Sequence, residues 1–380
     1  MKNIFLVGTT GSIGKSTLEV ISSLKDRYNL VGISANSNLE ELLKIYSEYK
    51  PKYILINDKE KSKVLKEKIQ SKNSGLFDDI FPYALIDDDV DIIFFASRGV
   101  DDIKWILEAI KKEKNIFIAN KESFVSAGEL IVKEMRKKRL SLIPIDSEHS
   151  AIFQLLLGKY EEEVKRIILT ASGGPFFDYD EKDLENITIS EALKHPTWKM
   201  GKKITIDSAT LFNKGMEVVE ANLLFDIPYD SIDVVIHRES IIHSMVEMKD
   251  GQVFALLYYP DMKYPIKYAL TFPDRVENNY RKLEFNEKLS FYPFDKNRYL
   301  PFKLIVESGK EGGTKPFTII YANDLLTDMF LNKKIKFLDI GKNLERVYDK
   351  IERREFSIKE VEDLKKEIED FIKREVKLCI

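Results

Sequence analysis

Four consecutive polar residues, Asp146-Ser147-Glu148-His149, occur in the stretch SLIPIDSEHSAIF, where an apolar run gives way to a helical pattern. The apolar run predicts a buried strand, and the residues after it have the spacing of a helix. Two carboxylates, a hydroxyl and an imidazole at such a junction are compatible with three arrangements. They are a helix cap, a hydrolytic Ser/His/Asp triad and a metal site.

The residue types favour the metal site. A cap accounts for part of the composition, because Ser147 is a good cap and carboxylates stabilise a first helical turn. The triad is disfavoured, because neighbours such as Ser147 and His149 diverge and no G-x-S-x-G sequence occurs. Asp146 and Glu148 can instead converge on Mg²⁺ or Mn²⁺, which prefer oxygen ligands. Cap and metal site are compatible, and a third carboxylate would strengthen the metal site.

A third carboxylate occurs in residues 194–225, the stretch richest in residues with possible roles in binding. Its Ser208, Asn213 and Lys214 are natural phosphate ligands. Glu217 follows Lys214 by three residues, so both side chains can share one face of a helix. The alternative is an intrahelical ion pair worth only ~0.2–0.5 kcal/mol.

Two further segments have features of an anion site and its cover. The segment LTASGGPFF (169–177) ends a predicted strand in Ser172 and two glycines, whose free backbone amides suit an anion nest. His195, Trp198 and Met200 precede KITIDSAT in a predicted loop. A tryptophan on an exposed loop is typical of a lid.

The glycine-rich loop GTTGSIG places Gly8, Gly11 and Gly14 between the first predicted strand and the first predicted helix. Glycine permits a sharp turn close to a diphosphate, and the N–H groups at the helix N-terminus point at the anion. The loop opens a series of alternating strands and helices. This context favours dinucleotide binding over a plain tight turn.

The end of the second predicted strand, ISANSNLE, bears on which nicotinamide nucleotide binds. NAD-binding proteins usually carry Asp or Glu there for the ribose hydroxyls. Here the tip is Asn36, Ser37 and Asn38. Because no carboxylate repels a 2′-phosphate, the sequence favours NADP, although the tip has no basic residue.

The segment IANKESFVSAG (118–128) follows another predicted buried strand. Asn120, Lys121 and Glu122 would face the crevice in which doubly wound sheets bind ligands. Lys121 can meet an anion or donate a proton. From spacing alone, a capped turn with a surface Lys–Glu pair is an equally weighted alternative.

These motifs lie on elements that predict an α/β chain of several domains. The first ~145 residues alternate strands and helices, which predicts a Rossmann-like NADP-binding domain. Strand-like runs at 164–177, 201–210 and 233–260 predict a central α+β domain, which contains Glu148, Lys214 and Glu217 and is therefore the expected catalytic domain, and the end of the chain reads as helical. The predicted limits are 1–146 for the nucleotide domain, 147–271 for the catalytic domain, 272–300 for a linker and 301–380 for a C-terminal helical domain.

Composition excludes several classes of protein. The net charge of −3 gives no reason to expect nucleic acid or an anionic membrane as partner. The single cysteine, Cys379, excludes an intramolecular disulfide. No signal peptide and no apolar run of ~18 residues occurs, so we expect a cytoplasmic protein without membrane spans.

Together the motifs resemble the 1-deoxy-D-xylulose 5-phosphate reductoisomerase family of the non-mevalonate isoprenoid pathway. The matching segments are GTTGSIG, ANKES, PIDSEHSAIFQ, SGGPF, HPTWKMGKKITIDSATLFNKGMEVVEA, IHSMV, PDMKYPI and FPDRV. The resemblance covers residues 1 to about 275 and continues more weakly to the end. Because several motifs recur in the same order, it is specific.

The resemblance implies a role for each matching residue. Catalytic roles fall to Lys121 and Glu148, and metal binding falls to Asp146, Glu148 and Glu217. The substrate would contact Lys121, Ser147, Glu148 and Glu217 near the metal, with its phosphate on Ser172, His195, Ser208, Asn213 and Lys214. NADPH would lie on Thr10, Gly11, Ser12, Ile13, Asn36, Ser37, Asn38, Asn120, Glu122 and Gly201. The loop with Trp198 and Met200 would be the lid, and the family implies a homodimer.

The implied reaction rearranges the phosphorylated sugar 1-deoxy-D-xylulose 5-phosphate and then reduces it with NADPH to 2-C-methyl-D-erythritol 4-phosphate. Metal polarisation would promote the rearrangement, by retro-aldol cleavage and re-addition. Some residues depart from the family pattern. Arg238-Glu239 replaces Pro-Gln, residues 321–330 match poorly, and Ser37 lacks the basic side chain of some members. A simple NADP dehydrogenase and a nucleotide-sensing Rossmann protein are the alternatives, and neither needs three converging carboxylates.

Overall fold

The computed structural model describes residues 1–198, 201–286 and 288–376, and its contacts divide the chain into two compact units. Unit 1 comprises Met1–Lys121, Ile131–Asp146 and Asp261–Glu277. Unit 2 comprises Glu122–Leu130, Ser147–Pro260 and the chain from Asn278 onward. Each unit is formed by three separate segments of the chain, whereas the sequence predicted four consecutive regions. The predicted limits of these regions stay predictions.

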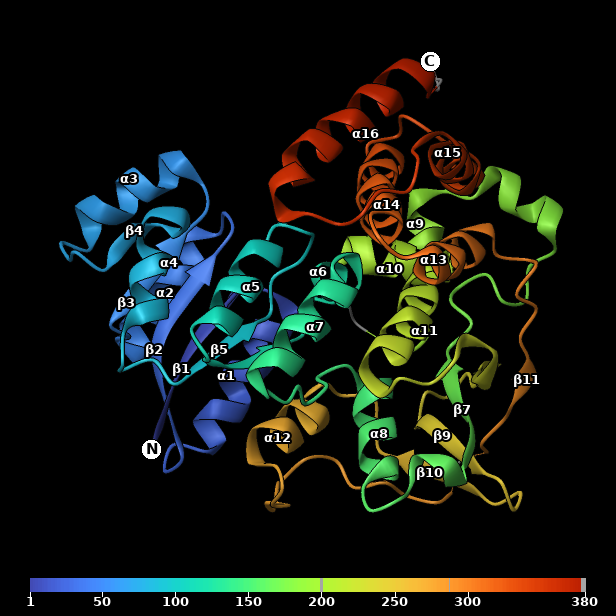
Figure 1. Cartoon of the computed structure of the whole chain (residues 1–380), viewed down its shortest axis with the longest axis horizontal. Coiled ribbons are helices and arrows are strands. Elements are labelled where there is room, and N and C mark those ends of the chain that lie inside the picture. Colours follow the sequence, from blue (N-terminus) through green and yellow to red (C-terminus); the bar gives the residue numbers. More distant parts are fainter. Residues whose placement is uncertain (199–200, 287, 377–380) are drawn as a thin grey trace. The chain divides into compact units, whose positions relative to one another are not determined.

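Unit 1 contains a six-stranded parallel sheet with the strand order β4-β3-β2-β1-β5-β6 (Figure 1). Its strands are β1 (Lys2–Val7), β2 (Tyr28–Ala35), β3 (Tyr53–Ile56), β4 (Ser74–Leu76), β5 (Ile92–Phe95) and β6 (Asn115–Ile118). Its helices are α1 (Ser12–Ser23), α2 (Leu39–Tyr49), α3 (Lys59–Lys68), α4 (Phe77–Ile86), α5 (Ile103–Lys111) and α12 (Lys263–Thr271). Helix α7 (Gly128–Lys138) begins in unit 2 and continues in unit 1.

The apolar runs of the sequence explain this sheet. Strands β3 and β5 are buried at every position, as expected for parallel strands with both faces covered. Helix α12 belongs to the same unit, because its Ile266, Ala269 and Leu270 join the core of the sheet. Strand β1 lies between β2 and β5, so the order of the strands reverses there. Ligands of such sheets bind beyond the carboxyl ends of the strands at this reversal.

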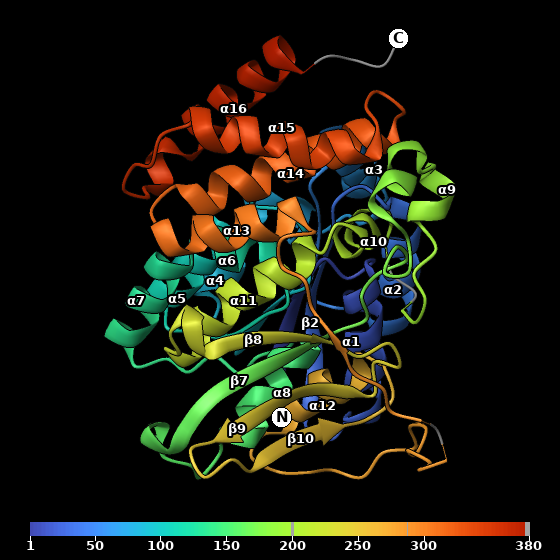
Figure 2. The same cartoon turned by 90° about the vertical axis from the view of Figure 1, so that its right-hand side faces the viewer.

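Among the described residues, unit 2 contains a five-stranded mixed sheet with the order β10-β9-β7-β8-β11, in which β7 and β8 are parallel and the other neighbours are antiparallel. Figure 2 shows β7 to β10 of this sheet. Its strands are β7 (Val164–Ala171), β8 (Ile232–Ile236), β9 (Ile242–Met248), β10 (Val253–Leu257) and β11 (Tyr292–Pro293). Its helices are α6 (Lys121–Ser126), α8 (Ser147–Leu156), α9 (Ile189–Ala192), α10 (Lys202–Ala209), α11 (Phe212–Phe225), α13 (Leu300–Glu311), α14 (Lys315–Leu331), α15 (Phe337–Lys350) and α16 (Val361–Glu375).

Helix α8 packs against β9 and β10, whereas α11 packs against α13 of the C-terminal helices. Helices α13–α16 lie together beyond α11, at the top of Figure 2. In the described part of the chain, no helix is long and apolar enough to cross a membrane.

Two of the predicted strands are wrong. Residues 141–145 form no strand, because Pro144 lacks the N–H group that a central strand would donate. Residues 202–209, predicted as a strand from the β-branched run of Ile204, Thr205 and Ile206, form helix α10. Tertiary contacts outweigh local β-propensity at this site.

Candidate active site

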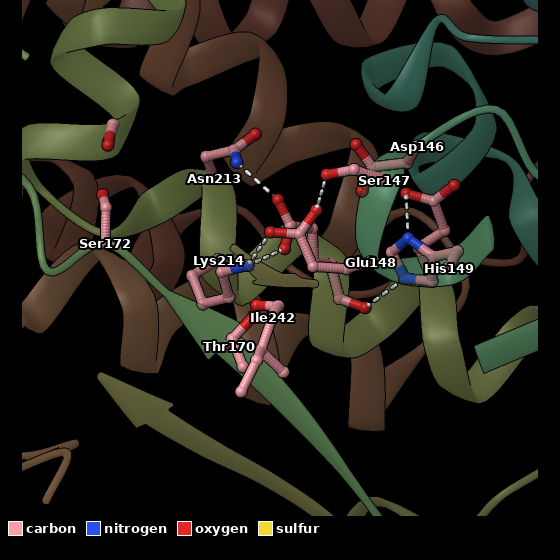
Figure 3. Close-up of polar contacts among 12 residues, drawn as sticks. Asp146, Ser147, Glu148, His149, Thr170, Ser172, Asn213, Lys214 and Ile242 are labelled. Atoms are coloured by element: carbon pink, nitrogen blue, oxygen red, sulfur yellow. Dashed lines mark hydrogen bonds and ion pairs between the residues drawn. The ribbon is translucent and has the colours of Figure 1, made fainter. Parts of the chain in front are cut away.

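The carboxylates of Glu148 and Glu217 meet at the ammonium group of Lys214 inside unit 2. Figure 3 shows Lys214 pointing toward Glu148. Glu148 is the second residue of α8, and Lys214 and Glu217 share one face of α11. Lys214 Nζ lies 2.8 Å from Glu148 Oε1 and is also bonded to Glu217 Oε2. Lys214 therefore joins two helices, and the intrahelical pair with Glu217 is only part of its environment.

Neutral donors hold the second oxygen of each carboxylate. Asn213 Nδ2 donates to Glu217 Oε1 at 2.6 Å, and the hydroxyl of Ser147 donates to Glu148 Oε2. Burial alone would lower the pKa of Lys214, but Glu148 and Glu217 outweigh it and raise that pKa. Lys214 is thus charged, and it lies between two carboxylates whose positions do not depend on it alone.

Asp146, the third predicted metal ligand, ends unit 1, one residue before α8 begins. Its Oδ2 lies 3.1 Å from Nζ of Lys121, the buried lysine predicted to act in catalysis. In unit 2, a carboxylate oxygen of Glu148 and one of Glu217 lie within 4.8 Å of each other. Each predicted metal ligand therefore has a lysine beside it, and all of the predicted donors are hard oxygen atoms, which suit Mg²⁺ or Mn²⁺.

His149, which the sequence interpretation left out of the metal and catalytic sets, is fully buried beneath this cluster. Its Nε2 donates to the backbone carbonyl of Glu217 at 2.8 Å, and its ring stacks on Phe225. Its Nδ1 lies 3.7 Å from Glu220 Oε2. His149 therefore fastens α8 to the turn of α11 that presents Glu217.

Ser172, His195 and Ser208 come together although they lie far apart in the sequence. His195 Nε2 is 3.1 Å from the hydroxyl oxygen of Ser172 and 3.0 Å from that of Ser208. Gly174 has φ +68°, and a Cβ there would lie 2.6 Å from the carbonyl oxygen of Ser208. The glycine turn can therefore pack directly on α10, as a binding wall of small polar groups requires.

The protonation of His195 follows from its hydrogen bonds. The backbone N–H groups of Thr197 and Trp198 donate to Nδ1 at 3.1 and 2.9 Å, so the ring proton resides on Nε2. Burial and the nearby charge of Arg238 lower the pKa of His195 to about 4. The imidazole is therefore neutral at pH 7 and aims its proton at the two serine hydroxyls. Met200, predicted with Trp198 to form the lid, lies outside the described residues.

The predicted nucleotide residues lie in both units. In unit 1, the loop containing Thr10 to Ile13 follows β1, and a Cβ on Gly14 would lie 2.4 Å from the carbonyl oxygen of Gly8. The tip of β2 consists of Asn36, Ser37 and Asn38, and the Asn38 side chain caps α2. Asn120 is buried and donates to Asp102 at 2.8 Å. In unit 2, Gly201 caps α10, and Glu122 faces Lys203.

Known proteins resemble this chain along nearly its whole length. Models of the 1-deoxy-D-xylulose 5-phosphate reductoisomerase family match residues 4–128, and models of its C-terminal domains match residues 142–225 and 257–372. The enzyme of Clostridium tetani with that name is 45% identical over 98% of this chain and 99% of its own length. The chain belongs to the 1-deoxy-D-xylulose 5-phosphate reductoisomerase family. This confirms the family, the α/β class and the Rossmann-like N-terminal domain predicted from the sequence.

Other reductoisomerases agree. The Clostridium perfringens protein is 43% identical over 98% of this chain and 99% of its own length. A crystal structure of a reductoisomerase in complex with NADPH, fosmidomycin and magnesium has a TM-score of 0.90 and 32% identity, and the match covers 98% of each chain. The reductoisomerase of Zymomonas mobilis in complex with NADPH has a TM-score of 0.87 and 36% identity, over 97% of each chain.

Sequence reasoning missed a second charged cluster in this reductoisomerase. Lys203 Nζ lies 2.6 Å from Asp207 Oδ2, 2.6 Å from Asp324 Oδ1 and 3.8 Å from Glu122 Oε1. Asn323 Nδ2 donates to the other oxygen of Asp207 at 2.8 Å. The spacing of Lys203 and Asp207 on one helix was the available signal. Asp324 and Asn323 lie in the segment 321–330 that matched the family poorly, so this segment contributes to a defined cluster.

Proposed function

We propose that this chain converts 1-deoxy-D-xylulose 5-phosphate into 2-C-methyl-D-erythritol 4-phosphate with NADPH, at a site built on Asp146, Glu148 and Glu217. The observation that carries the proposal is the convergence of Glu148 and Glu217 on one cation, with Asp146 two residues before Glu148 in the chain. Family membership supports the reaction, and the oxygen donors support a divalent metal.

The metal ligands would be released by movement of lysines. Lys214 neutralises Glu148 and Glu217, and Lys121 neutralises Asp146. Ser147 and Asn213 keep their bonds to the carboxylates when the ammonium of Lys214 moves away, so the ligand geometry is preorganised. When bound, the metal supplies Lewis-acid polarisation of the substrate oxygens, and NADPH supplies the hydride.

The residues near the metal also serve proton transfer in this proposal. Lys121, which is buried, can donate a proton to a substrate oxygen from beside Asp146. Glu148 can accept one through the oxygen that Ser147 now holds. General acid–base catalysis would require both groups to come within hydrogen-bond reach of the substrate.

The far end of the substrate would bind to the second group of residues. Lys214, once released, can pair with a phosphate dianion, and Asn213 can donate to it. Ser172, Ser208 and neutral His195 supply hydrogen bonds without adding charge. The binding energy of this phosphate can position the reacting carbons of the substrate and favour closure of the predicted lid, which follows His195.

The test is an assay of NADPH oxidation with the substrate, after chelation of metal and again with added Mg²⁺ or Mn²⁺. We expect turnover that requires the metal. Turnover that continues without metal favours the simple dehydrogenase, and NADPH binding without any turnover favours the nucleotide sensor.

A matched pair of variants locates the ligands. His149 and Glu220 form an alternative donor pair on the same two helices, with a nitrogen and an oxygen 3.7 Å apart. His149 is already bonded to a backbone carbonyl, so we expect Glu217→Gln to weaken Mg²⁺ binding in calorimetry by more than about 100-fold. Glu220→Gln should weaken Mg²⁺ binding less than Glu217→Gln does. Replacing a residue that supports the ligands, without binding the metal itself, typically lowers metal affinity 10–100-fold. The reverse order would assign the metal to His149 and Glu220.

The homodimer is also a proposal, supported by the outer strand of the unit 2 sheet. Strand β10 pairs only with β9 among the described residues, and Val253 and Phe254 on it are 50% and 40% exposed. An exposed apolar edge strand is suited to pairing with a second copy. Sedimentation of the wild-type chain and of Phe254→Glu tests the dimer. The cytoplasmic location stays a prediction, which cell fractionation tests.

A further inference from the structure

The tip of β2 lacks the basic side chain that a 2′-phosphate would need, and the structure brings one there from helix α3. Lys61 Nζ donates to the backbone carbonyl of Ser37 at 2.7 Å. An ammonium has three N–H donors, so this bond leaves donors for a ligand. Lys61 thus supplies a cation at the position where the sequence predicts the adenosine ribose.

The sheet itself fixes this placement. Strand β3 pairs with β2, and the turn after β3 continues the pairing beyond the last residue of β2. The backbone N–H of Asn57 donates to the carbonyl of Ala35 at 3.1 Å, and that of Asp58 to the carbonyl of Asn36 at 3.0 Å. Asp58 then caps α3. Lys61, in the first turn of that helix, is therefore held near the tip by backbone geometry.

A groove of about 650 Å³ opens at this place, lined by Ser37, Asn38, Lys61 and Lys68 among others. Its volume is in the range of small-molecule sites. Lys61 and Lys68 lie seven residues apart on α3, two helical turns, so both point to one side. Glu40 is the acidic residue of the lining, and Lys44 pairs with it at 3.0 Å. The groove consequently carries an excess of positive charge.

We infer that Lys61, assisted by Lys68, binds the 2′-phosphate of NADPH and sets the preference of this chain for NADPH over NADH. The inference rests on the proposed binding of NADPH at the tip of β2. It assigns the discriminating cation to α3 instead of to position 37. A charge-assisted hydrogen bond between Lys61 and the 2′-phosphate can form with NADPH but not with NADH, which lacks that phosphate.

The test measures dissociation constants of NADPH and NADH by calorimetry without substrate, for the wild type and for Lys61→Ala, Lys68→Ala and Lys63→Ala. We expect Lys61→Ala to weaken NADPH binding about 10-fold or more, from the ~1.5–3 kcal/mol of a hydrogen bond to a charged group, with NADH binding unchanged. Lys68→Ala should weaken NADPH binding less. Lys63→Ala is the control, because Lys63 lies on the same helix and pairs with Glu60 at 2.8 Å but does not line the groove, whereas Lys61 lines the groove with Asp58 4.0 Å away.

Two outcomes would overturn the inference. One is that Lys61→Ala weakens NADPH and NADH equally, and the other is that Lys63→Ala has the same effect as Lys61→Ala. Lys61→Arg should retain most of the preference, which separates loss of charge from loss of fold. If the wild type bound neither nucleotide, the proposed function itself would fail. The preference of the wild type should also decrease with added salt, because the groove is open to solvent.

Discussion

Lys203 and Lys214 lie on consecutive helices of unit 2, and each is enclosed by carboxylates. The side chain of Lys214 is 6% exposed and that of Lys203 is 15% exposed. Lys214 meets Glu148 and Glu217 from two helices, whereas Lys203 meets Asp207, Asp324 and Glu122 from three. Burial and charge are thus similar, and neither property alone tells a ligand site from a structural cluster.

The difference lies in what the lysine connects. Asn213 and Ser147 hold the carboxylates around Lys214 from behind, so the arrangement is suited to exchange its ammonium for a metal. Lys203 joins the chain segment of α6 to α10 and α14, and moving it would separate three elements. Burial alone would lower the pKa of Lys203, but its carboxylate partners outweigh burial and raise it. The pKa of Lys214 is raised in the same way, so the expected difference between the two lysines rests on the elements that each of them joins.

Replacing Lys203 should have the largest effect on stability. Lys203→Met leaves Asp207 with an uncompensated charge in the interior, and breaking a buried pair in this way costs roughly 3–5 kcal/mol. Urea denaturation measures the loss, and added Mg²⁺ should not restore it. Lys202→Met is the matched control, because Lys202 is the exposed neighbour on the same helix. A loss below ~1 kcal/mol for Lys203→Met would contradict the structural role.

Replacing Lys214 should have a smaller net effect, because a metal can take the place of the ammonium. Without metal, Lys214→Met should destabilise the chain by a similar ~3–5 kcal/mol. With Mg²⁺ at about 100 times its dissociation constant, binding to the folded state returns about 2.7 kcal/mol. The same denaturation experiment with and without Mg²⁺ checks this. Equal rescue of Lys203→Met and Lys214→Met would remove the distinction between the two clusters.

The two clusters also show what the sequence could predict. Asp146, Glu148, Lys214 and Glu217 stand in compact motifs, so residue types and spacing were enough to predict a metal site, which stays a prediction until metal binding is measured. The fold class was predicted correctly because buried strands and helices alternate along unit 1. The partners of Lys203 lie far apart in the chain, and only folding brings them together.

The errors have the same cause. Helix α10 carries a β-branched run that predicts a strand, but its Lys203 meets Asp324 of α14 and Glu122 of α6, which lie far away in the sequence. No motif marks Lys61 in the sequence, because its bond to Ser37 depends on the pairing of β3 with β2. Local patterns cannot encode contacts of this kind, because they depend on where another segment of the chain has packed.

A change of pH should distinguish His195 from the lysines. Burial holds the pKa of His195 at about 4 in the folded state, below the ordinary value of 6.5. Between these values the unfolded chain binds the proton more readily, so stability falls as the pH is lowered from about 6.5 to about 4. We expect His195 to contribute ~1–2 kcal/mol of this loss, since partial exposure reduces the full ~1.36 kcal/mol per pKa unit.

Nuclear magnetic resonance titration of the four histidines tests this assignment, with His195→Asn identifying the signal. His243 has its pKa lowered to about 4 by burial, so its signal should shift in the same range. A pKa near 6.5 for His195 would mean that its ring is charged in part at neutral pH. The phosphate wall would then carry positive charge beyond that of Lys214.

The smallest expected effect comes from a helix cap that touches neither cluster. Thr188 and Glu191 form a capping box at the start of α9, shortly before His195. Thr188→Ala should cost about 1 kcal/mol of stability, the usual loss for such a cap. Mg²⁺ affinity should not change, because the metal ligands lie on other elements. If Thr188→Ala also weakened Mg²⁺ binding, a loss of stability anywhere in unit 2 could lower metal affinity. The comparison of Lys203 with Lys214 could then not separate an effect on stability from an effect on metal binding.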